Sequence, residues 1–179
     1  RMESSVGDFV VESCPLAAFW PRPSGDEVAR RVNMAFSVGP NRTVYQDPGY
    51  GIRQIVDVAL KALSPGINDT TTAINCIDFL GAILVRLAGR RIEPTHRSDG
   101  DRLRVIARGP TFPDLLGASF AQIRQNAAGN VAVLTRRLQI LAILAARLVR
   151  TPRRAAVSRQ GDPAPRRADP GLARAGRAL

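Results

Sequence analysis

Four polar side chains near the centre of the sequence have the types and spacing of a cation site. Asp57 lies in one helix-patterned stretch and Asn75 in the next, while Asn68 and Asp69 end the linker Ser-Pro-Gly-Ile-Asn-Asp between them. Because this linker turns the chain back on itself, we expect the four side chains to converge near one end of a helical pair. Carboxylate and amide oxygens are the ligands that magnesium takes in proteins. The pattern therefore suggests an acidic pocket for a divalent cation such as magnesium.

The same turn offers a second kind of site. Backbone amides at the start of the second helix lack partners within that helix, and the hydroxyls of Thr70, Thr71 and Thr72 lie beside them. Such a group could receive a phosphate or a carboxylate. Taken together, the candidate binding residues of this region are Asp47, Arg53, Asp57, Asn68, Asp69, Asn75 and Asp78.

Each candidate also has a structural interpretation. Asp69 has the side chain of a good helix N-cap, and Asp47 precedes Pro48 and Gly49 as aspartate does in ordinary turns. Both residues could therefore do no more than begin a helix.

The remaining candidates could be surface charges. Arg53, Asp57 and Lys61 are four residues apart, which stacks them on one helical face as a charge ladder. Asn75 and Asp78 share a face of the next helix. A ladder of this kind is either a solvated face or an internal ion-pair network.

Two predicted helices position these side chains. Apolar residues recur at helical spacing over 52–63 and again over 73–87, and Ser64-Pro65-Gly66 separates the two runs. Asn68 or Asp69 is the expected cap of the second helix, which ends near Gly89.

The other elements make the predicted fold class α+β, mostly helical with a small β portion. Strand-forming residues over 7–20 predict a strand pair formed by residues 9–11 and 16–20. A hairpin is expected over 91–108 around Asp99-Gly100, and it could share a sheet with the first pair. Further helices are expected over 26–36, 113–128 and 130–150.

Charge divides the chain into a predicted body, residues 1–150, and a tail, residues 151–179. The net charge is +11, and Lys61 is the only lysine. Seven arginines and two aspartates lie in the tail, which is otherwise rich in Ala, Pro and Gly, so we expect it to be disordered. An arginine-rich tail could bind nucleic acid, but no aromatic residues are interleaved with the arginines. Nucleic acid is therefore an improbable partner.

The sequence lacks the motifs of several common catalytic and metal sites. His96 is the only histidine, and the chain has neither a His-Glu-x-x-His nor a Cys-x-x-Cys spacing, so a zinc site is not expected. A serine triad would need a Gly-x-Ser-x-Gly elbow, and a P-loop would need a glycine-rich loop ending in Lys-Ser or Lys-Thr; neither is present. Cys14 and Cys76 are far apart, so a reducing compartment is expected.

No stretch is predicted to span a membrane, which needs roughly 20 mostly apolar residues. The run 73–88 contains Asp78 and Arg86, and the run 131–149 contains three arginines. The second run has the pattern of a basic amphipathic helix, with its stripe at positions such as Leu134, Leu138 and Leu141. It could lie on an anionic membrane surface, pack on a partner, or close the core with its arginines in water.

The long motif QDPGYGIRQIVDVALKALSPGINDTTTAINCIDFLGAIL resembles the signature of an uncharacterised bacterial family of predicted membrane proteins, the domain-of-unknown-function family two-two-five-four. GDFVVESCPLAAFW before it and SFAQIRQNA after it are similar to other parts of that family, so the resemblance covers roughly 4–150. The family pattern favours Gly at Ser13 and Pro at Thr70. The resemblance implies transmembrane helices ahead of Arg1, a soluble portion after them, and a place at the bacterial inner membrane. It supplies no catalytic residues.

Three functions follow as expectations. The first is a non-enzymatic soluble module of a membrane protein, on the cytoplasmic side, for assembly, ligand sensing or gating. Its partners would be its own transmembrane segments and a second copy of the chain. The second is a cation- or phosphate-binding pocket of an enzyme or transporter component. The third is nucleic-acid binding through the tail.

Overall fold

The computed structural model describes residues 1–21 and 25–150 in full and the backbone of 173–177. It has five helices and four strands in these residues, which confirms a mostly helical α+β chain. The chain forms two compact units, one built from Arg1–Thr43, Glu93–Gly109 and Gln160–Leu179, the other from Val44–Ile92 and Pro110–Arg159. The second unit carries the candidate residues.

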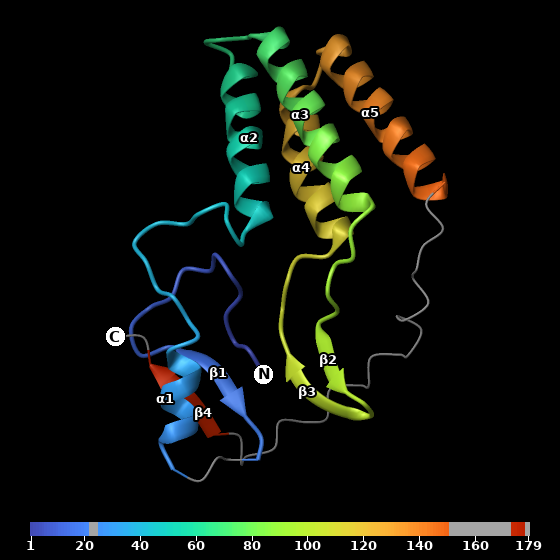
Figure 1. Cartoon of the computed structure of the whole chain (residues 1–179). Coiled ribbons are helices and arrows are strands. Elements are labelled where there is room, and N and C mark those ends of the chain that lie inside the picture. Colours follow the sequence, from blue (N-terminus) through green and yellow to red (C-terminus); the bar gives the residue numbers. More distant parts are fainter. Residues whose placement is uncertain (22–24, 151–172, 178–179) are drawn as a thin grey trace. The chain divides into compact units, whose positions relative to one another are not determined.

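The second unit is a bundle of four helices, all close to their predicted positions. They are α2 (Pro48–Ala62), α3 (Thr70–Ala88), α4 (Phe112–Asn126) and α5 (Val131–Arg150). Helix α3 packs against the other three, and α4 also packs against α2 (Figure 1). The apolar spacing of each sequence predicts these packed faces, since residues three and four apart share one side of a helix.

Helix α3 contributes the largest share of the core. Ile77, Leu80 and Leu84 are fully buried and belong to one core cluster with Ile52 of α2 and Ile123 of α4. Burying one such aliphatic side chain stabilises the fold by about 1.5–3 kcal/mol. The core is therefore organised around one helix rather than shared equally by four.

Helices α3 and α5 approach each other closely at Gly81. A Cβ atom placed on Gly81 would lie 2.6 Å from Cγ2 of Ile140, closer than real Cβ contacts permit. At the first turns, Asn130 Nδ2 donates to Thr70 Oγ1 at 2.8 Å, so the two helices begin side by side. Glycine at position 81 is what allows Ile140 to pack directly on the α3 backbone.

By length and composition, α3 is the one helix among the described residues that could cross a membrane; its mean hydropathy is 1.5 and 33% of its most apolar stretch is buried. The expectation that no segment qualifies was therefore wrong by this measure, because Asp78 and Arg86 are too few to offset the apolar residues. A core helix of a bundle passes the same test, and the buried third of this stretch packs in the core.

The first unit contains β1 (Pro15–Phe19), α1 (Glu27–Asn33), β2 (His96–Asp99), β3 (Arg102–Ile106) and β4 (Ala173–Arg177). Strands β2 and β3 form the predicted hairpin, with Gly100 in its turn at φ +57°. Strand β1 pairs with β4 on one edge, while Met2 forms a bridge to Ala17 on the other.

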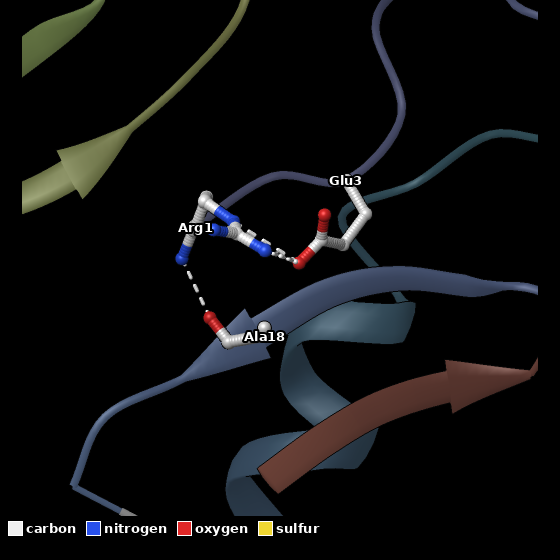
Figure 2. A network of polar contacts seen from close by, with 3 residues as sticks. All are labelled: Arg1, Glu3 and Ala18. Carbon is white, nitrogen blue, oxygen red and sulfur yellow. Dashed lines mark hydrogen bonds and ion pairs between the residues drawn. The ribbon is translucent and has the colours of Figure 1, made fainter. Parts of the chain in front are cut away.

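Residues 1–3 hold the free edge of β1. The Arg1 amine donates to the Ala18 carbonyl at 2.5 Å, and the Arg1 guanidinium pairs with Glu3 at 2.7 Å (Figure 2). Glu3 N donates to Leu16 O at 2.9 Å, and Met2 N donates to Ile106 O at 2.8 Å. The N-terminal residues therefore connect β1 to the end of β3.

Three expectations for the first unit were wrong. Residues 9–11 form no strand, because both edges of β1 are already occupied, and the Phe9 side chain is 94% exposed. The two predicted hairpins form no common sheet; β1 and β4 make one sheet, β2 and β3 another. Helix α1 is shorter than predicted and buries none of its residues.

Of the tail predicted over 151–179, residues 151–172 and 178–179 lie outside the described residues. The backbone of 173–177 is strand β4.

Candidate functional site

The Asn-Asp turn between α2 and α3 is a helix cap. Asn68 has a left-handed backbone (φ +47°), which asparagine tolerates better than most residues. Asp69 accepts a hydrogen bond from Thr72 N at 3.0 Å through Oδ1 and another from Thr72 Oγ1 at 2.5 Å through Oδ2. Both carboxylate oxygens therefore serve the first turn of α3. The structural interpretation of Asp69 is sufficient to explain its position.

These hydrogen bonds make the stability contribution of Asp69 dependent on pH. The Thr72 hydroxyl, followed by its backbone amide, lowers the pKa of Asp69 from the ordinary value of 3.8. A carboxylate with a lowered folded-state pKa stabilises the fold fully above its unfolded-state pKa, and this contribution is lost as the pH falls through the lower folded-state pKa. Asp69 therefore supports α3 at neutral pH but not in strong acid.

We expect Asp69→Ala to lower the melting temperature by a few degrees at pH 7, because it removes the cap. Asp69→Asn keeps an acceptor but not the charge, so its melting temperature should fall below that of the wild type at pH 7. The two should converge only as the pH falls from 3.8 through the lower folded-state pKa of Asp69. Thermal melts between pH 2 and 7 measure this difference. Curves for Asp69→Asn and the wild type that stay parallel over that range would contradict the role of the charge.

Asp47 is the corresponding cap of α2. It is 7% exposed, and its Oδ1 accepts from Tyr50 N at 3.0 Å, with Pro48 in the first helical turn. Proline needs no amide partner at this position. The turn interpretation of Asp47 is thus confirmed.

The charge ladder forms an ion pair at its first step. Arg53 Nη2 lies 2.5 Å from Asp57 Oδ1, and Arg53 Nη1 donates to Gln122 of α4 at 2.5 Å. Both charged side chains are about half exposed, at 48% and 52%. Exposed pairs contribute roughly 0.2–1 kcal/mol, so this contact joins α2 to α4 without deciding the fold. The Lys61 side chain is exposed.

Arg53 also lines an open depression between α2 and α4. Its volume is about 340 Å³, and its other lining residues are Gly117, Ala118, Ala121 and Gln122. Three of its five lining residues, Gly117, Ala118 and Ala121, have side chains no larger than a methyl group. The depression therefore offers Arg53 and Gln122 as its only polar side chains.

Asp78 is paired across the bundle rather than with Asn75. Arg136 Nε of α5 donates to Asp78 Oδ1 at 2.6 Å, and both side chains are just under 40% exposed. This hydrogen bond and the charge of Asp78 raise the pKa of Arg136. Asn75 lies on the exposed side of α3. The pair therefore fixes α5 beside α3.

The described contacts show no convergence of the candidate residues. Asp57 pairs within its own helix, Asp69 is committed to its cap, and Asp78 faces α5. Within 1–21 and 25–150, no three His, Cys, Asp or Glu side chains lie close enough together to hold a metal ion. The candidate residues thus act mainly as caps and helix-to-helix contacts.

Sequence reasoning missed the partners of these residues. Asn130 caps α5, with its Oδ1 accepting from Val133 N at 3.2 Å, and also reaches Thr70. Gln122 and Arg136 complete the contacts of Arg53 and Asp78. No spacing rule links positions about 60 residues apart, so these pairings appear only once the helices are packed. The Asn130 cap was detectable, because it directly precedes an apolar run.

Comparison with known proteins places the chain among uncharacterised bacterial sequences. It is 36% identical over 161 residues to Uncharacterized protein Rv1290c of Mycobacterium tuberculosis and equally to Uncharacterized protein Mb1321c of Mycobacterium bovis. The match takes in 87% of this chain and 31% of each relative, so the chain spans about a third of their length. No solved structure matches it. Residues 1–143 match the family described as Predicted membrane protein (DUF2254), and the chain belongs to that family.

Proposed function

We propose that this chain is a non-enzymatic module of a bacterial inner-membrane protein, and that it assembles the protein by pairing α5 with α5 of a second copy. The observation that carries this proposal is an exposed seam along α5. It consists of Val131, Thr135, Leu138, Ala142, Ala145 and Val149. Family membership supports the link to a membrane protein.

The outer seam of α5 has the spacing of a helix-pairing surface. Its six residues alternate at intervals of four and three, which is the a/d repeat of a coiled coil. Val131, Leu138 and Val149 are 74%, 61% and 84% exposed. Alanines between them would let a second helix approach closely. The inward face, with Val133, Ile140 and Leu144, is already used by the bundle.

The positions of the arginines favour a protein partner over a lipid surface. Arg136, Arg137 and Arg147 lie in the half of α5 opposite the outer seam, by the helical repeat of 3.6 residues. A helix that binds anionic lipid carries its basic residues beside the apolar face, where they reach headgroups. Here they point away from it. Two copies can therefore meet along the seam without opposing like charges, except at Arg150.

We place the module on the cytoplasmic side. Its two free cysteines, Cys14 and Cys76, agree with a reducing compartment. Cys14 is exposed. Modification of Cys14 in intact cells by a membrane-impermeant maleimide, with the full-length protein expressed, would contradict this placement.

Leu138→Glu is expected to weaken self-association at least about tenfold, because it puts a charge at the centre of a helix interface. Sedimentation of the purified chain over a range of concentrations measures this change. Val58→Glu is the matched control, since Val58 on α2 is exposed to a similar degree, 51% against 61%. The control should associate like the wild type.

A wild-type chain that remains monomeric at every concentration would overturn the α5 pairing. Equal losses in Leu138→Glu and Val58→Glu would do the same, since the effect would then follow the added charge and not its position. Association with vesicles of anionic lipid that depends on Leu138, without any dimer, would replace the second copy with a membrane surface.

A further inference from the structure

The outer side of α5 is uncharged along most of its length. The helix lies at the edge of the bundle and packs chiefly against α3 (Figure 1). On one side of the outer seam lie Ala132, Gln139 and Ala146, which are exposed. On the other side lie three leucines, at positions 134, 141 and 148, which are partly buried. The exposed surface is therefore made of apolar and small polar side chains.

The arginines of α5 leave this side free of charge. We expected them to lie in water, but Arg136 pairs with Asp78 of α3 and the Nε atom of Arg137 is buried. No charged residue occupies the outer seam or the positions on either side of it, where ion pairs often set the relative direction of paired helices. The direction of an α5 pair must then follow from the sizes of the seam residues.

The outer seam is symmetric about the level of residue 140. Its six residues form three pairs, each equidistant from that level: Leu138 and Ala142, Thr135 and Ala145, Val131 and Val149. When two copies of the helix run in opposite directions about a two-fold axis at this level, each residue meets the other member of its pair. Every layer of the contact then places an a position against a d position, as knobs-into-holes packing requires.

The sizes of these side chains favour opposite directions. In an antiparallel pair, Leu138 meets Ala142 of the second copy and Thr135 meets its Ala145, so a larger side chain faces alanine at every inner layer. In a parallel pair, leucine would meet leucine at 138, and alanine would meet alanine at 142 and 145. Two packed helices keep nearly one separation along a short contact. A parallel pair would therefore either crowd the leucines or leave gaps at the alanines.

Opposite directions also remove the one electrostatic conflict of the pairing. In a parallel pair the two copies of Arg150 would lie side by side, whereas in the antiparallel pair they are about 30 Å apart. The N-terminal end of each helix, which carries positive partial charge, then lies beside the negative C-terminal end of the other. Charge and size thus favour the same arrangement.

We propose that two copies of the chain pair through α5 in antiparallel directions, with a two-fold axis at the level of Ile140. This inference rests on the α5 pairing proposed above and adds its direction and register. The two-fold axis of such a pair is perpendicular to both helices. In a membrane protein whose two copies are inserted in the same sense, that axis runs along the membrane normal. Helix α5 therefore lies parallel to the membrane plane, whereas a parallel pair would place it upright.

Disulfide trapping measures the direction and the register. Thr135→Cys and Ala145→Cys are made separately in a chain that carries Cys14→Ser, so that the other thiol is the buried Cys76. One variant carries a tag that changes its mass, and the mixture is oxidised with copper phenanthroline. A disulfide needs Cα atoms about 4.4–6.8 Å apart, and like positions are about 15 Å apart along the antiparallel pair. We therefore expect the mixed 135–145 dimer to exceed either self-dimer at least about tenfold on a non-reducing gel.

Val131→Cys mixed with Ala142→Cys is the matched control. Both positions belong to the outer seam, but in the antiparallel pair they are seven residues out of register, or about 10 Å along the helix. Their mixed dimer should therefore form little disulfide. Sedimentation of the reduced variants checks that each still associates as the wild type does.

The possible results separate the direction from the pairing itself. Disulfides between like positions, 135–135 and 145–145, without the mixed product would overturn the antiparallel direction and leave the α5 pairing intact. Equal yields of the 135–145 and 131–142 products would overturn the register. A dimer in sedimentation that forms no disulfide at these positions would overturn both the direction and the outer seam as its interface. A chain that is monomeric in sedimentation would contradict the proposed function, and this inference with it.

Discussion

Gly81→Ala is expected to lower the free energy of unfolding, although alanine is the better helix former. The added methyl would stand 2.6 Å from Ile140 Cγ2 and 3.1 Å from its Cδ1. Cγ2 is a branch at the β-carbon and cannot swing aside as the end of a flexible chain does. Overpacking of this kind costs about 1–3 kcal/mol, against a propensity gain of roughly 1 kcal/mol. Denaturant unfolding of the two proteins measures the net change.

Gly117→Ala is the matched control for this experiment. Gly117 lies within α4, and a Cβ atom there would have nothing within 4 Å. The helix propensity gain is then unopposed, and stability should rise by about 0.5–1 kcal/mol. The same substitution is therefore expected to have opposite signs at two helical glycines. If Gly81→Ala stabilised the chain as much as Gly117→Ala, the close α3–α5 contact would be wrong.

The partner of the clash can be identified by a double-mutant cycle. Ile140→Ala alone should be destabilising, since Ile140 is 7% exposed. In the Gly81→Ala background the same change also relieves the overlap. The two effects should then fail to add, by roughly 0.5–3 kcal/mol. Additive effects would place the strain at some residue other than Ile140.

The helical unit was predictable from local pattern. Apolar residues recur at helical spacing over 52–63 and 73–87, and Asp69 is followed by residues that begin a helix. The sequence therefore predicts α2 and α3 to within a few positions of their observed bounds. For the same reason Asn68 or Asp69 was expected as a cap, and Asp47 as a turn residue. Caps and amphipathic faces depend on neighbours within one or two turns, which a single sequence displays.

The missed features all depend on residues far apart in the chain. Phe9 and Val11 have strand-forming side chains, yet β1 finds its neighbours at Met2 and in β4. Asp78 was grouped with Asn75 on its own helix, but its partner is Arg136 of α5. Strand pairing and interhelical ion pairs are decided by packing, so propensity carries no information about them.

In α5, the predicted apolar stripe was rotated relative to the side of the helix that faces the core, and this changes which surface is exposed. The expected stripe included Leu138, which is 61% exposed, and omitted Val133 and Ile140, which are buried. Helix α5 is apolar on two sides, so periodicity alone could not decide which side faces the core. The structure assigns Val133 and Ile140 to the core and leaves the outer seam exposed. That assignment is what motivates the pairing of two copies.

Helix α3 raises the sharpest question about the chain, because its hydropathy fits both a bundle core and a membrane span. Ile77→Ala is expected to lower the free energy of unfolding by about 2–5 kcal/mol, since Ile77 is fully buried against its neighbours. Phe79→Ala, two residues along, should change it by less than about 0.5 kcal/mol, because the Phe79 ring is 65% exposed.

Chemical denaturation of the purified chain without detergent measures both variants. A helix in the core of a water-soluble bundle must respond strongly on the side that packs and weakly on the side that faces solvent. Small and equal effects at Ile77 and Phe79 would mean that α3 does not pack in water as the bundle requires, and its place in the membrane would then have to be considered. The expected contrast instead makes α3 the core of the module, with α5 beside it carrying the outer seam.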